Sequence, residues 1–249
     1  MDGTLYDNRF HQVSTKTFEA LHTLQEQGNY VFLATSRCLK ELENLPRAMY
    51  NFTFDGRITD GGALILNKEK QVIKHQPIST EIVQAINTYC KENHIYFRYS
   101  TLDGNYFSSP DNQAFHELEF QLYLNAPIYK PYEDDACLNL LIWTQTPQQR
   151  DELKEICRDC SIVSYPECLE IRDSNIDKAS AIQEMIERFQ LQRTICFGDG
   201  ENDVQMLKLA DQGIAMQNAC QELKEIADQI IGPVDQDGIY YYLKEQEVR

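Results

Sequence analysis

Two stretches decide the fold of this chain: Met1-Asp2-Gly3-Thr4-Leu5 at its start and Cys196-Phe197-Gly198-Asp199-Gly200-Glu201-Asn202-Asp203 near its end. The second stretch reads as the end of an apolar strand followed by a helix, which puts Asp199 and Asp203 four residues apart at the turn. Both carboxylates can then point into one pocket and bind a hard cation such as Mg²⁺ through oxygen. A plain glycine turn, with Asp203 favoured by the helix dipole, would explain the same residues without a ligand.

Outward from these stretches, helix-period and strand-like segments alternate along the chain. Ser14 can cap a helix that Gly28 ends, and the apolar run over 30–34 reads as a buried strand. Further helices are expected over 80–93, 112–124, 147–160, 177–190 and 202–209, with strands over 95–100, 137–144, 194–198 and 213–216. This alternation predicts an α/β fold with a doubly wound, Rossmann-like parallel sheet built from residues 1–75 and 176–249. Residues 76–175 are expected to form a separate α+β unit, inserted as a cap.

Polar side chains stand where the strands of this sheet end, which is where open α/β folds bind ligands. Thr35 follows the strand over 30–34, and its hydroxyl and the backbone N–H of Ser36 could hold phosphate oxygens. Lys178 opens a helix, where the macrodipole disfavours a cation, so a phosphate or carboxylate is expected beside it. Each residue also has an ordinary explanation, Thr35 as a strand-end residue and Lys178 as a solvated surface lysine.

In their order and spacing these motifs resemble the haloacid dehalogenase (HAD) superfamily. Its signature opens Asp-x-Asp-Gly-Thr, which Asp2-Gly3-Thr4 continues, and closes Gly-Asp-x-x-Asn-Asp, which the stretch from Gly198 to Asp203 matches. Two more segments, Ala34-Thr35-Ser36-Arg37 and Asp60-Gly61-Gly62, resemble the family's Ala-Thr-Gly-Arg and Asn-Gly-Ala, with Ser36 and Asp60 as departures. The resemblance covers nearly the whole chain and points to the Cof-type, C2-capped (type IIB) hydrolases.

The resemblance implies a Mg²⁺-dependent phosphatase of small phosphorylated metabolites, with sugar phosphates the expected class. In such enzymes an Asp attacks phosphorus, and water then hydrolyses the aspartyl-phosphate. By the same resemblance, Asp2 is the general acid and base and offers its backbone carbonyl to Mg²⁺. The implied phosphate ligands are Thr35, Ser36, Lys178 and Asn202, and the implied metal ligands beside Asp2 are Asp199 and Asp203.

The nucleophile of the family signature falls one residue before Met1. The strand that carries it is central to this fold, and its loss would cost about 1 kcal/mol per hydrogen bond and about 1.5–3 kcal/mol per buried side chain. Since that sum rivals a whole domain's stability of about 5–15 kcal/mol, we expect Met1 to be an internal methionine of a longer protein. A chain that began at Met1 would turn over several orders of magnitude more slowly. Two alternatives to a phosphatase stay open: a phosphomutase and a catalytically dead phosphate-binding remnant.

The composition excludes some classes of binding partner. Lys and Arg number 23 against 39 Asp and Glu, a net charge of −16, which repels nucleic acid and anionic membrane surfaces. The eight cysteines are scattered and no signal peptide precedes them, which indicates reduced thiols and a cytoplasmic protein. Cys157-Arg158-Asp159-Cys160 is read as part of a half-buried helix rather than half of a zinc site. Substrate choice is expected to lie with the cap. Arg98 and Tyr99 on a cap strand could reach a substrate there, but a solvent-facing strand edge is the favoured interpretation of both residues. The oligomeric state is not readable.

Overall fold

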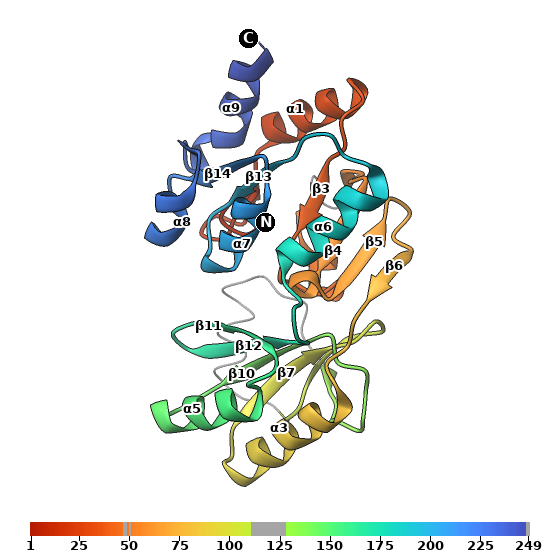
Figure 1. Ribbon diagram of the computed structural model, residues 1–249, viewed down its shortest axis with the longest axis vertical. Coiled ribbons are helices and arrows are strands. Elements are labelled where there is room, and N and C mark those ends of the chain that lie inside the picture. The colour runs from red at the N-terminus through yellow and green to blue at the C-terminus, as the bar shows by residue number, and fades with distance from the viewer. Residues whose placement is uncertain (47–48, 50, 111–127, 248–249) are drawn as a thin grey trace.

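The computed structural model describes residues 1–46, 49, 51–110 and 128–247. Its helices and strands form two groups (Figure 1), one that contains both ends of the chain and one built from the middle of the chain. We call them the core and the cap; their predicted division at residues 76 and 175 stays a prediction. Within the described residues, no helix combines the length and the apolar character needed to cross a membrane.

In its described residues, the core contains two larger β-sheets and one short two-stranded hairpin. In the four-stranded sheet the order is β3 (Phe32–Ala34), β4 (Gly56–Thr59), β5 (Leu64–Asn67) and β6 (Val72–His75), with β3 parallel to β4 and the other pairs antiparallel. The three-stranded sheet is parallel throughout and consists of β13 (Ile195–Gly198), β14 (Gln212–Met216) and β15 (Gln229–Ile231). The predicted α/β fold is confirmed, but its core sheet is mixed rather than wholly parallel because β4, β5 and β6 are joined by short connections that turn the chain back.

The helices around these sheets include α1 (Thr15–Glu26), α6 (Lys178–Phe189), α7 (Val204–Leu209), α8 (Gln221–Ile226) and α9 (Gly238–Glu247). Shorter elements complete the core, namely the hairpin of β1 (Tyr6–Asp7) with β2 (Gln12–Val13) and the 3₁₀-helices Lys40–Asn44, Asp60–Gly62, Glu201–Asp203 and Val234–Gln236. Ser14 caps α1 as predicted, since its side chain accepts a hydrogen bond from the N–H of Thr17. Gly28, with φ at 87°, lies just beyond the end of this helix.

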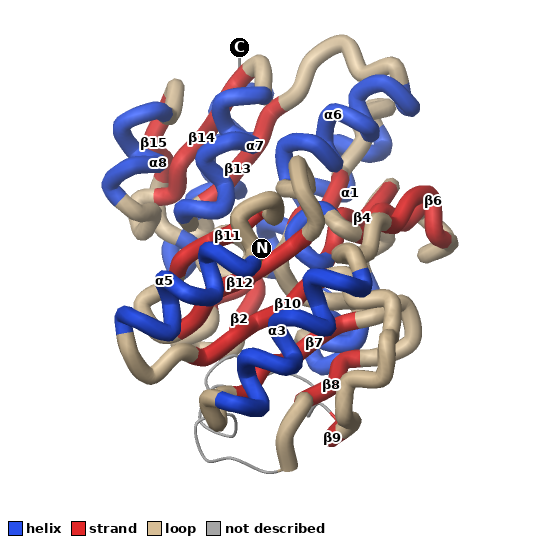
Figure 2. Tube along the Cα trace, turned by 60° about the horizontal axis from the view of Figure 1, so that its bottom comes forward, coloured by secondary structure: helices blue, strands red, loops and turns tan. Residues whose placement is uncertain are grey.

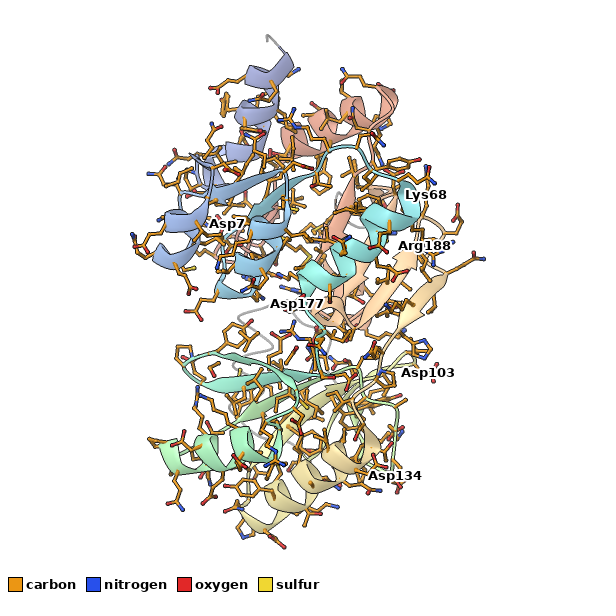
Figure 3. All side chains as sticks on the ribbon, viewed as in Figure 1. Asp7, Lys68, Asp103, Asp134, Asp177 and Arg188 are labelled. Atoms are coloured by element: carbon orange, nitrogen blue, oxygen red, sulfur yellow. The ribbon has the colours of Figure 1, made fainter. Side chains whose placement is uncertain are left out.

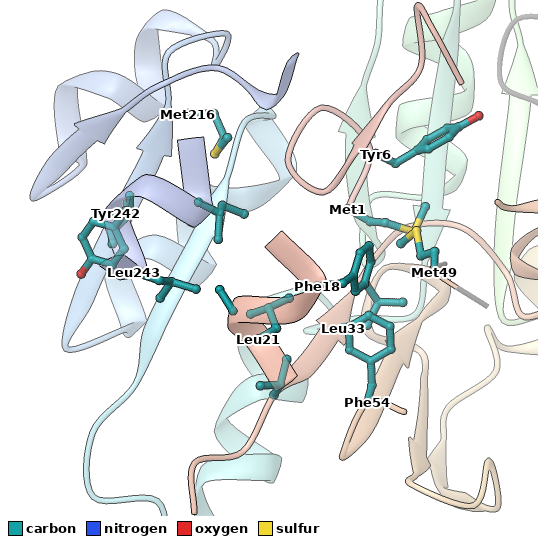
Figure 4. Packing of buried hydrophobic residues seen from close by; sticks show 14 of the residues in the cluster. Met1, Tyr6, Phe18, Leu21, Leu33, Met49, Phe54, Met216, Tyr242 and Leu243 are labelled. Atoms are coloured by element: carbon teal, nitrogen blue, oxygen red, sulfur yellow. The ribbon is translucent and has the colours of Figure 1, made fainter. Parts of the chain in front are cut away.

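Met1 lies between the two core sheets. Its amino group is 3.5 Å from the carbonyl oxygen of Ala34, the last residue of β3, and interacts electrostatically with Asp199, which follows β13. The Met1 side chain is buried in the cluster that contains Phe18, Leu33 and Phe54 (Figure 4). Among the described strands, β3 and β13 are each paired on one side only, and Ile195 at the start of β13 is 38% exposed.

The cap is built on a six-stranded sheet, and the two helices within its described residues cover one face of that sheet (Figure 2). Its strand order is β11 (Ser161–Ser164), β12 (Cys168–Arg172), β10 (Asn139–Trp143), β7 (Tyr96–Ser100), β8 (Asn105–Phe107) and β9 (Ile128–Tyr129), and its helices are α3 (Thr80–Glu92) and α5 (Pro147–Ile156). The predicted helix over 112–124 lies outside the described residues. All eight cysteines are free; Cys157 is buried just after α5, which ends before the predicted residue 160.

The cap sheet has one apolar face and one polar face because side chains alternate along each strand. Leu169 and Ile171 of β12 pack in the apolar cluster under α3 and α5, and Phe97 and Tyr99 of β7 do the same. The alternate residues of these strands are buried polar groups: Arg98 and Ser100 on β7, Asn139 on β10, and Glu170 and Arg172 on β12. Their hydrogen bonds reach loops of the core, so the polar face of the cap sheet faces the core.

Candidate active site

Asp199 and Asp203 lie together at the turn after β13. The carboxylate of Asp203 is 3% exposed, and its Oδ2 accepts hydrogen bonds from the N–H groups of Asp199 and Gly200 at 3.0 and 3.2 Å. Asp203 thereby fixes the backbone of the turn that carries Asp199. The carboxylate of Asp199 accepts a hydrogen bond of 2.6 Å from the hydroxyl of Thr4.

The turn at the start of the chain packs directly onto Asp199. Gly3 has φ at 69°, in the region that side chains disfavour, and a Cβ placed on it would lie 2.0 Å from Oδ2 of Asp199. Only glycine permits this approach. The N–H of Gly3 bonds the carbonyl of Tyr6, and its carbonyl accepts a hydrogen bond from Asn218, so the turn is held from both sides.

Lys178 reaches this turn from the first residue of α6. It follows Asp177, the residue that caps the N-terminus of α6 and lies at the end of the core nearest the cap (Figure 3). Its ammonium Nζ is 2.6 Å from Oδ1 of Asp203, and both side chains are 4% exposed. The anion expected beside this lysine is therefore Asp203, and the surface interpretation of Lys178 is wrong.

Burial and charge act in opposite directions on the two aspartates. Burial alone would raise the pKa of Asp203, but the ammonium groups of Lys178 and Met1 and the hydrogen bonds to the carboxylate outweigh burial and lower the pKa. Burial dominates for Asp199 and raises its pKa, although the Met1 ammonium and the Thr4 hydroxyl oppose the shift. Asp199 is thus the carboxylate of this turn with the least compensated charge, and a cation beside it would be stabilising.

The carboxylate of Asp2 binds a different partner from those of Asp199 and Asp203. Its carboxylate forms a forked ion pair with the buried Arg37, with Nε at 3.1 and 3.0 Å from the two oxygens and Nη2 at 2.6 Å from Oδ1. Arg37 stands two residues after Thr35, and its N–H donates to the Thr35 hydroxyl. The ends of β3 and of the first turn are therefore joined through Asp2 and Arg37.

The remaining predicted phosphate residues divide into one buried and two accessible side chains. Thr35 is 2% exposed, whereas Ser36 and Asn202 are partly exposed and hydrogen-bonded to each other, with Asn202 Nδ2 3.0 Å from Ser36 Oγ. The side chains that meet here come from the end of β3 and from the turn after β13. These two strand ends lie on either side of Met1, in the arrangement that an anion site at a sheet edge requires.

The cap touches this pair directly. Asn202 Nδ2 also donates to the hydroxyl of Tyr165, at 3.1 Å, and that hydroxyl donates to Oε2 of Glu170 at 3.1 Å. Ser36 Oγ is 3.4 Å from the same carboxylate oxygen, and Asn139 donates to the other oxygen of Glu170 at 2.7 Å. Of the two accessible residues predicted to bind phosphate, Asn202 therefore contacts Tyr165 of the cap, and Ser36 contacts Glu170 of the cap.

Three more contacts join the polar face of the cap sheet to the core. Arg98 pairs with Glu41 at 2.6 Å with both side chains 3% exposed, which corrects the prediction that Arg98 is solvent-facing. Tyr99 is fully buried under the cap helices, so the same prediction is wrong for it. The other two contacts are Ser100 Oγ to Asp60 Oδ1 at 2.5 Å and Arg172 Nη1 to the carbonyl of Gly61 at 2.8 Å.

The residues at the turn after β13 fit a bound cation. The carboxylates of Asp199, Asp203 and Asp2 all lie within electrostatic reach of the Met1 nitrogen, so three negative charges gather around this point. Within the described residues, however, no three His, Cys, Asp or Glu side chains converge as ready metal ligands. The contacts give the reason: Asp203 is engaged by Lys178 and Asp2 by Arg37, so Asp199 is the carboxylate of the three that could serve as the main side-chain ligand of a cation.

Comparison with known proteins identifies the family. A model of the haloacid dehalogenase-like hydrolases matches residues 1–243. The chain belongs to this family. Among its relatives, YkrA of Bacillus subtilis strain 168 is 29% identical, over 98% of this chain and 95% of that protein. The 5-amino-6-(5-phospho-D-ribitylamino)uracil phosphatase YcsE of the same organism is 26% identical, over 96% of this chain and 90% of that protein.

The solved structures agree with this assignment. The structure of BT4131, described as a HAD subclass IIB sugar phosphatase, superposes with a TM-score of 0.89 at 27% identity and covers all of this chain and 97% of that chain. The haloacid dehalogenase-like family, its subclass IIB and the α/β fold expected from the sequence are thereby confirmed. The chain is a relative of phosphatases.

Several residues of this HAD-like site escaped the sequence analysis. Arg37 and Thr4 stand inside quoted motifs, yet nothing in the motifs indicates that they bind Asp2 and Asp199. Tyr165 and Glu170 come from the cap and reach the site only through the way the cap sheet folds over the core. The alternation along 168–172, apolar at Leu169 and Ile171, was the available signal for Glu170, since it predicts the opposite face for that residue.

Proposed function

We propose that this site hydrolyses small phosphate monoesters, with sugar phosphates as the main class and Mg²⁺ as the cofactor. The observation that carries the proposal is the meeting of a buried Lys178–Asp203 pair, the partly exposed Ser36 and Asn202, and the carboxylate of Asp199 at adjoining strand ends. Two relatives support the substrate class by their descriptions, one as a phosphatase of a phosphoribityl compound and one as a sugar phosphatase.

The proposed nucleophile is an aspartate bonded directly before Met1. The Met1 nitrogen lies at the end of β3 and within electrostatic reach of Asp199, Asp203 and Lys178. A residue attached to that nitrogen therefore enters the site at the point where its side chain can meet a phosphoryl group. A carboxylate oxygen there would attack phosphorus while the ester oxygen leaves, and water would then release inorganic phosphate and restore the aspartate.

Asp2 is the proposed proton carrier. It would give a proton to the leaving oxygen and later accept one from the attacking water, as a general acid and then a general base. For either step its carboxylate must turn away from Arg37, which holds it through two forked contacts. The partial exposure of Asp2, with 29% of its side chain accessible, leaves room for this rotation.

Phosphate binding is assigned to Lys178, Ser36, Asn202 and Thr35, which lie at the end of β3 or at the turn after β13. Mg²⁺, held by Asp199 with support from Asp203 and the backbone carbonyl of Asp2, would supply positive charge against the phosphate and the nucleophile. That charge is needed because the protein as a whole carries a net charge of −16 and repels anions. Lys178 adds a fixed cation, which Asp203 keeps in position.

The test is Asp199→Asn in a chain extended by an apolar strand that ends in Asp directly before Met1. We expect Mg²⁺ affinity and the turnover of a phosphate ester panel to fall at least tenfold, because Asp199 is the carboxylate left for the cation. Asp151→Asn, an exposed position on α5, is the matched control and should change neither quantity. Unchanged Mg²⁺ binding in Asp199→Asn would remove this residue from the metal site.

A further inference from the structure

The hydroxyl of Tyr165 stands at the junction between the cap and the phosphate residues. Tyr165 lies in the loop between β11 and β12, and its hydroxyl donates to Glu170 and accepts from Asn202, both at 3.1 Å. A phenol oxygen has one hydrogen to donate and two lone pairs to accept with. Within the described residues, this hydroxyl thus has its hydrogen and one lone pair in use.

Phosphate must compete with Tyr165 for Asn202. The amide of Asn202 has two hydrogens, and they go to Ser36 Oγ at 3.0 Å and to the Tyr165 hydroxyl at 3.1 Å. If Asn202 binds a phosphoryl oxygen, it must release one of these acceptors. Ser36 belongs to the same strand-end site and can turn with the phosphate, whereas Tyr165 comes from the cap.

Tyr165 cannot readily move with Asn202, because its hydroxyl also donates a hydrogen bond to Glu170. Glu170 is 1% exposed and is itself fixed by Asn139 at 2.7 Å. Burial, and then the carboxylate of Glu170, raise the pKa of Tyr165, so the hydroxyl keeps its proton. When Asn202 turns to phosphate, the Tyr165 oxygen therefore keeps its bond to Glu170 and loses its donor, which leaves a half-buried acceptor unpaired.

We propose that Tyr165 is a specificity-determining residue, whose hydroxyl accepts a hydrogen bond from a donor on the leaving group of the substrate. The inference rests on the proposed function, since it assumes that phosphate binds at Asn202. A hydroxyl on the leaving group of a phosphate ester replaces the donor that Asn202 withdraws. An alkyl phosphate offers no such donor and leaves the Tyr165 oxygen unpaired.

The experiment compares two esters with the same carbon skeleton. Glycerol 2-phosphate carries a hydroxyl on each carbon next to the ester carbon, and isopropyl phosphate carries none. Dissociation constants for both, and for inorganic phosphate, would be measured by isothermal titration calorimetry with Mg²⁺ for the parent chain, Tyr165→Phe and Tyr241→Phe. Tyr241 is 54% exposed on α9 and controls for the loss of a phenol hydroxyl elsewhere.

The parent is expected to bind glycerol 2-phosphate roughly fivefold more tightly than isopropyl phosphate, the value of one net hydrogen bond. Tyr165→Phe should reduce the ratio to about one and bind inorganic phosphate at least as tightly as the parent, because Asn202 no longer has a competing acceptor. Tyr241→Phe should keep the parental ratio. A second variant, Glu170→Gln, can donate an amide hydrogen to the Tyr165 oxygen and should lower the ratio in the same direction.

Two outcomes overturn the inference, and they are distinguishable. If inorganic phosphate and both esters bind but Tyr165→Phe keeps the parental ratio, or the parent shows no preference, Tyr165 does not read the leaving group and the proposed function stands. If neither ester nor inorganic phosphate binds to the parent, the phosphate site itself is wrong and the proposed function falls with the inference.

Discussion

Asp60 makes the stability of this protein depend on pH in a way that a single substitution can remove. The residue stands at the turn after β4, where its carboxyl accepts hydrogen bonds from Thr59 and from Ser100 of the cap. It is fully buried, and this burial raises its pKa from 3.8 to about 7 against the opposing effects of Ser100 and Arg98. The folded protein therefore favours the protonated acid, whereas the unfolded chain ionises near pH 4.

The sign and size of the effect follow from this shift. Because the folded-state pKa is the higher one, the stabilising contribution is complete below pH 4 and is lost as the pH rises through 7. Between pH 5 and pH 8 the loss amounts to roughly 2–3 kcal/mol, at 1.36 kcal/mol per pKa unit. Asp60→Asn keeps an acceptor oxygen, carries no charge and matches the asparagine usual at this position in the family, so it should remove the dependence.

The assay is urea unfolding of the parent and of Asp60→Asn at pH 5 and pH 8. We expect the variant to gain roughly 2–3 kcal/mol of unfolding free energy relative to the parent between the two pH values. Asp103→Asn, in an exposed cap loop (Figure 3), is the control and should show no such gain. If the unfolding free energies of Asp60→Asn and the parent differ by the same amount at pH 5 and pH 8, Asp60 is ionised in the folded protein and the raised pKa is wrong.

Two further substitutions test the geometry of the site. Gly3→Ala puts a Cβ 2.0 Å from Asp199 Oδ2, so it should weaken Mg²⁺ binding in calorimetric titrations as well as cost more than about 1–2 kcal/mol in backbone strain. Gly28→Ala, also at positive φ but with open space around it, should show the strain alone, and equal Mg²⁺ affinity in both variants would count against the contact. Lys178→Met leaves the buried Asp203 carboxylate without its cation, so it should lower the urea unfolding free energy at pH 7 by roughly 3–5 kcal/mol. A loss below about 1 kcal/mol would mean that the pair is not buried in solution.

Local sequence signals predicted the start of α1, an anion beside Lys178 and the turn after β13, because these signals act over short distances. Ser14 before an amphipathic run marks the start of α1, and the prediction that Lys178 needs an anion follows from the helix dipole alone. The turn that joins Asp199 to Asp203 is likewise encoded within five residues. In each case the deciding interaction lies within one element or at its end.

The cap contacts could not be predicted because they depend on how two distant sheets meet. Arg98 reads as a solvent-facing residue from its strand alone, but Glu41 lies 57 residues away in the chain and buries it. Tyr165 and Asn202 are separated by 37 residues, and they lie in a loop of the cap and in the turn after β13 of the core. The single parallel core sheet was also expected from the alternation of elements, yet that pattern does not reveal which strands pair on both sides.

The most direct test of the proposed phosphatase concerns the position before Met1. Two chains would be made with the same apolar strand ahead of Met1, one ending in Asp and one in Asn, and hydrolysis of glycerol 2-phosphate would be followed with Mg²⁺. We predict turnover by the Asp chain and a loss of several orders of magnitude in the Asn chain, with inorganic phosphate bound equally by both. Equal turnover by the two chains would contradict it, and so would the absence of turnover in both.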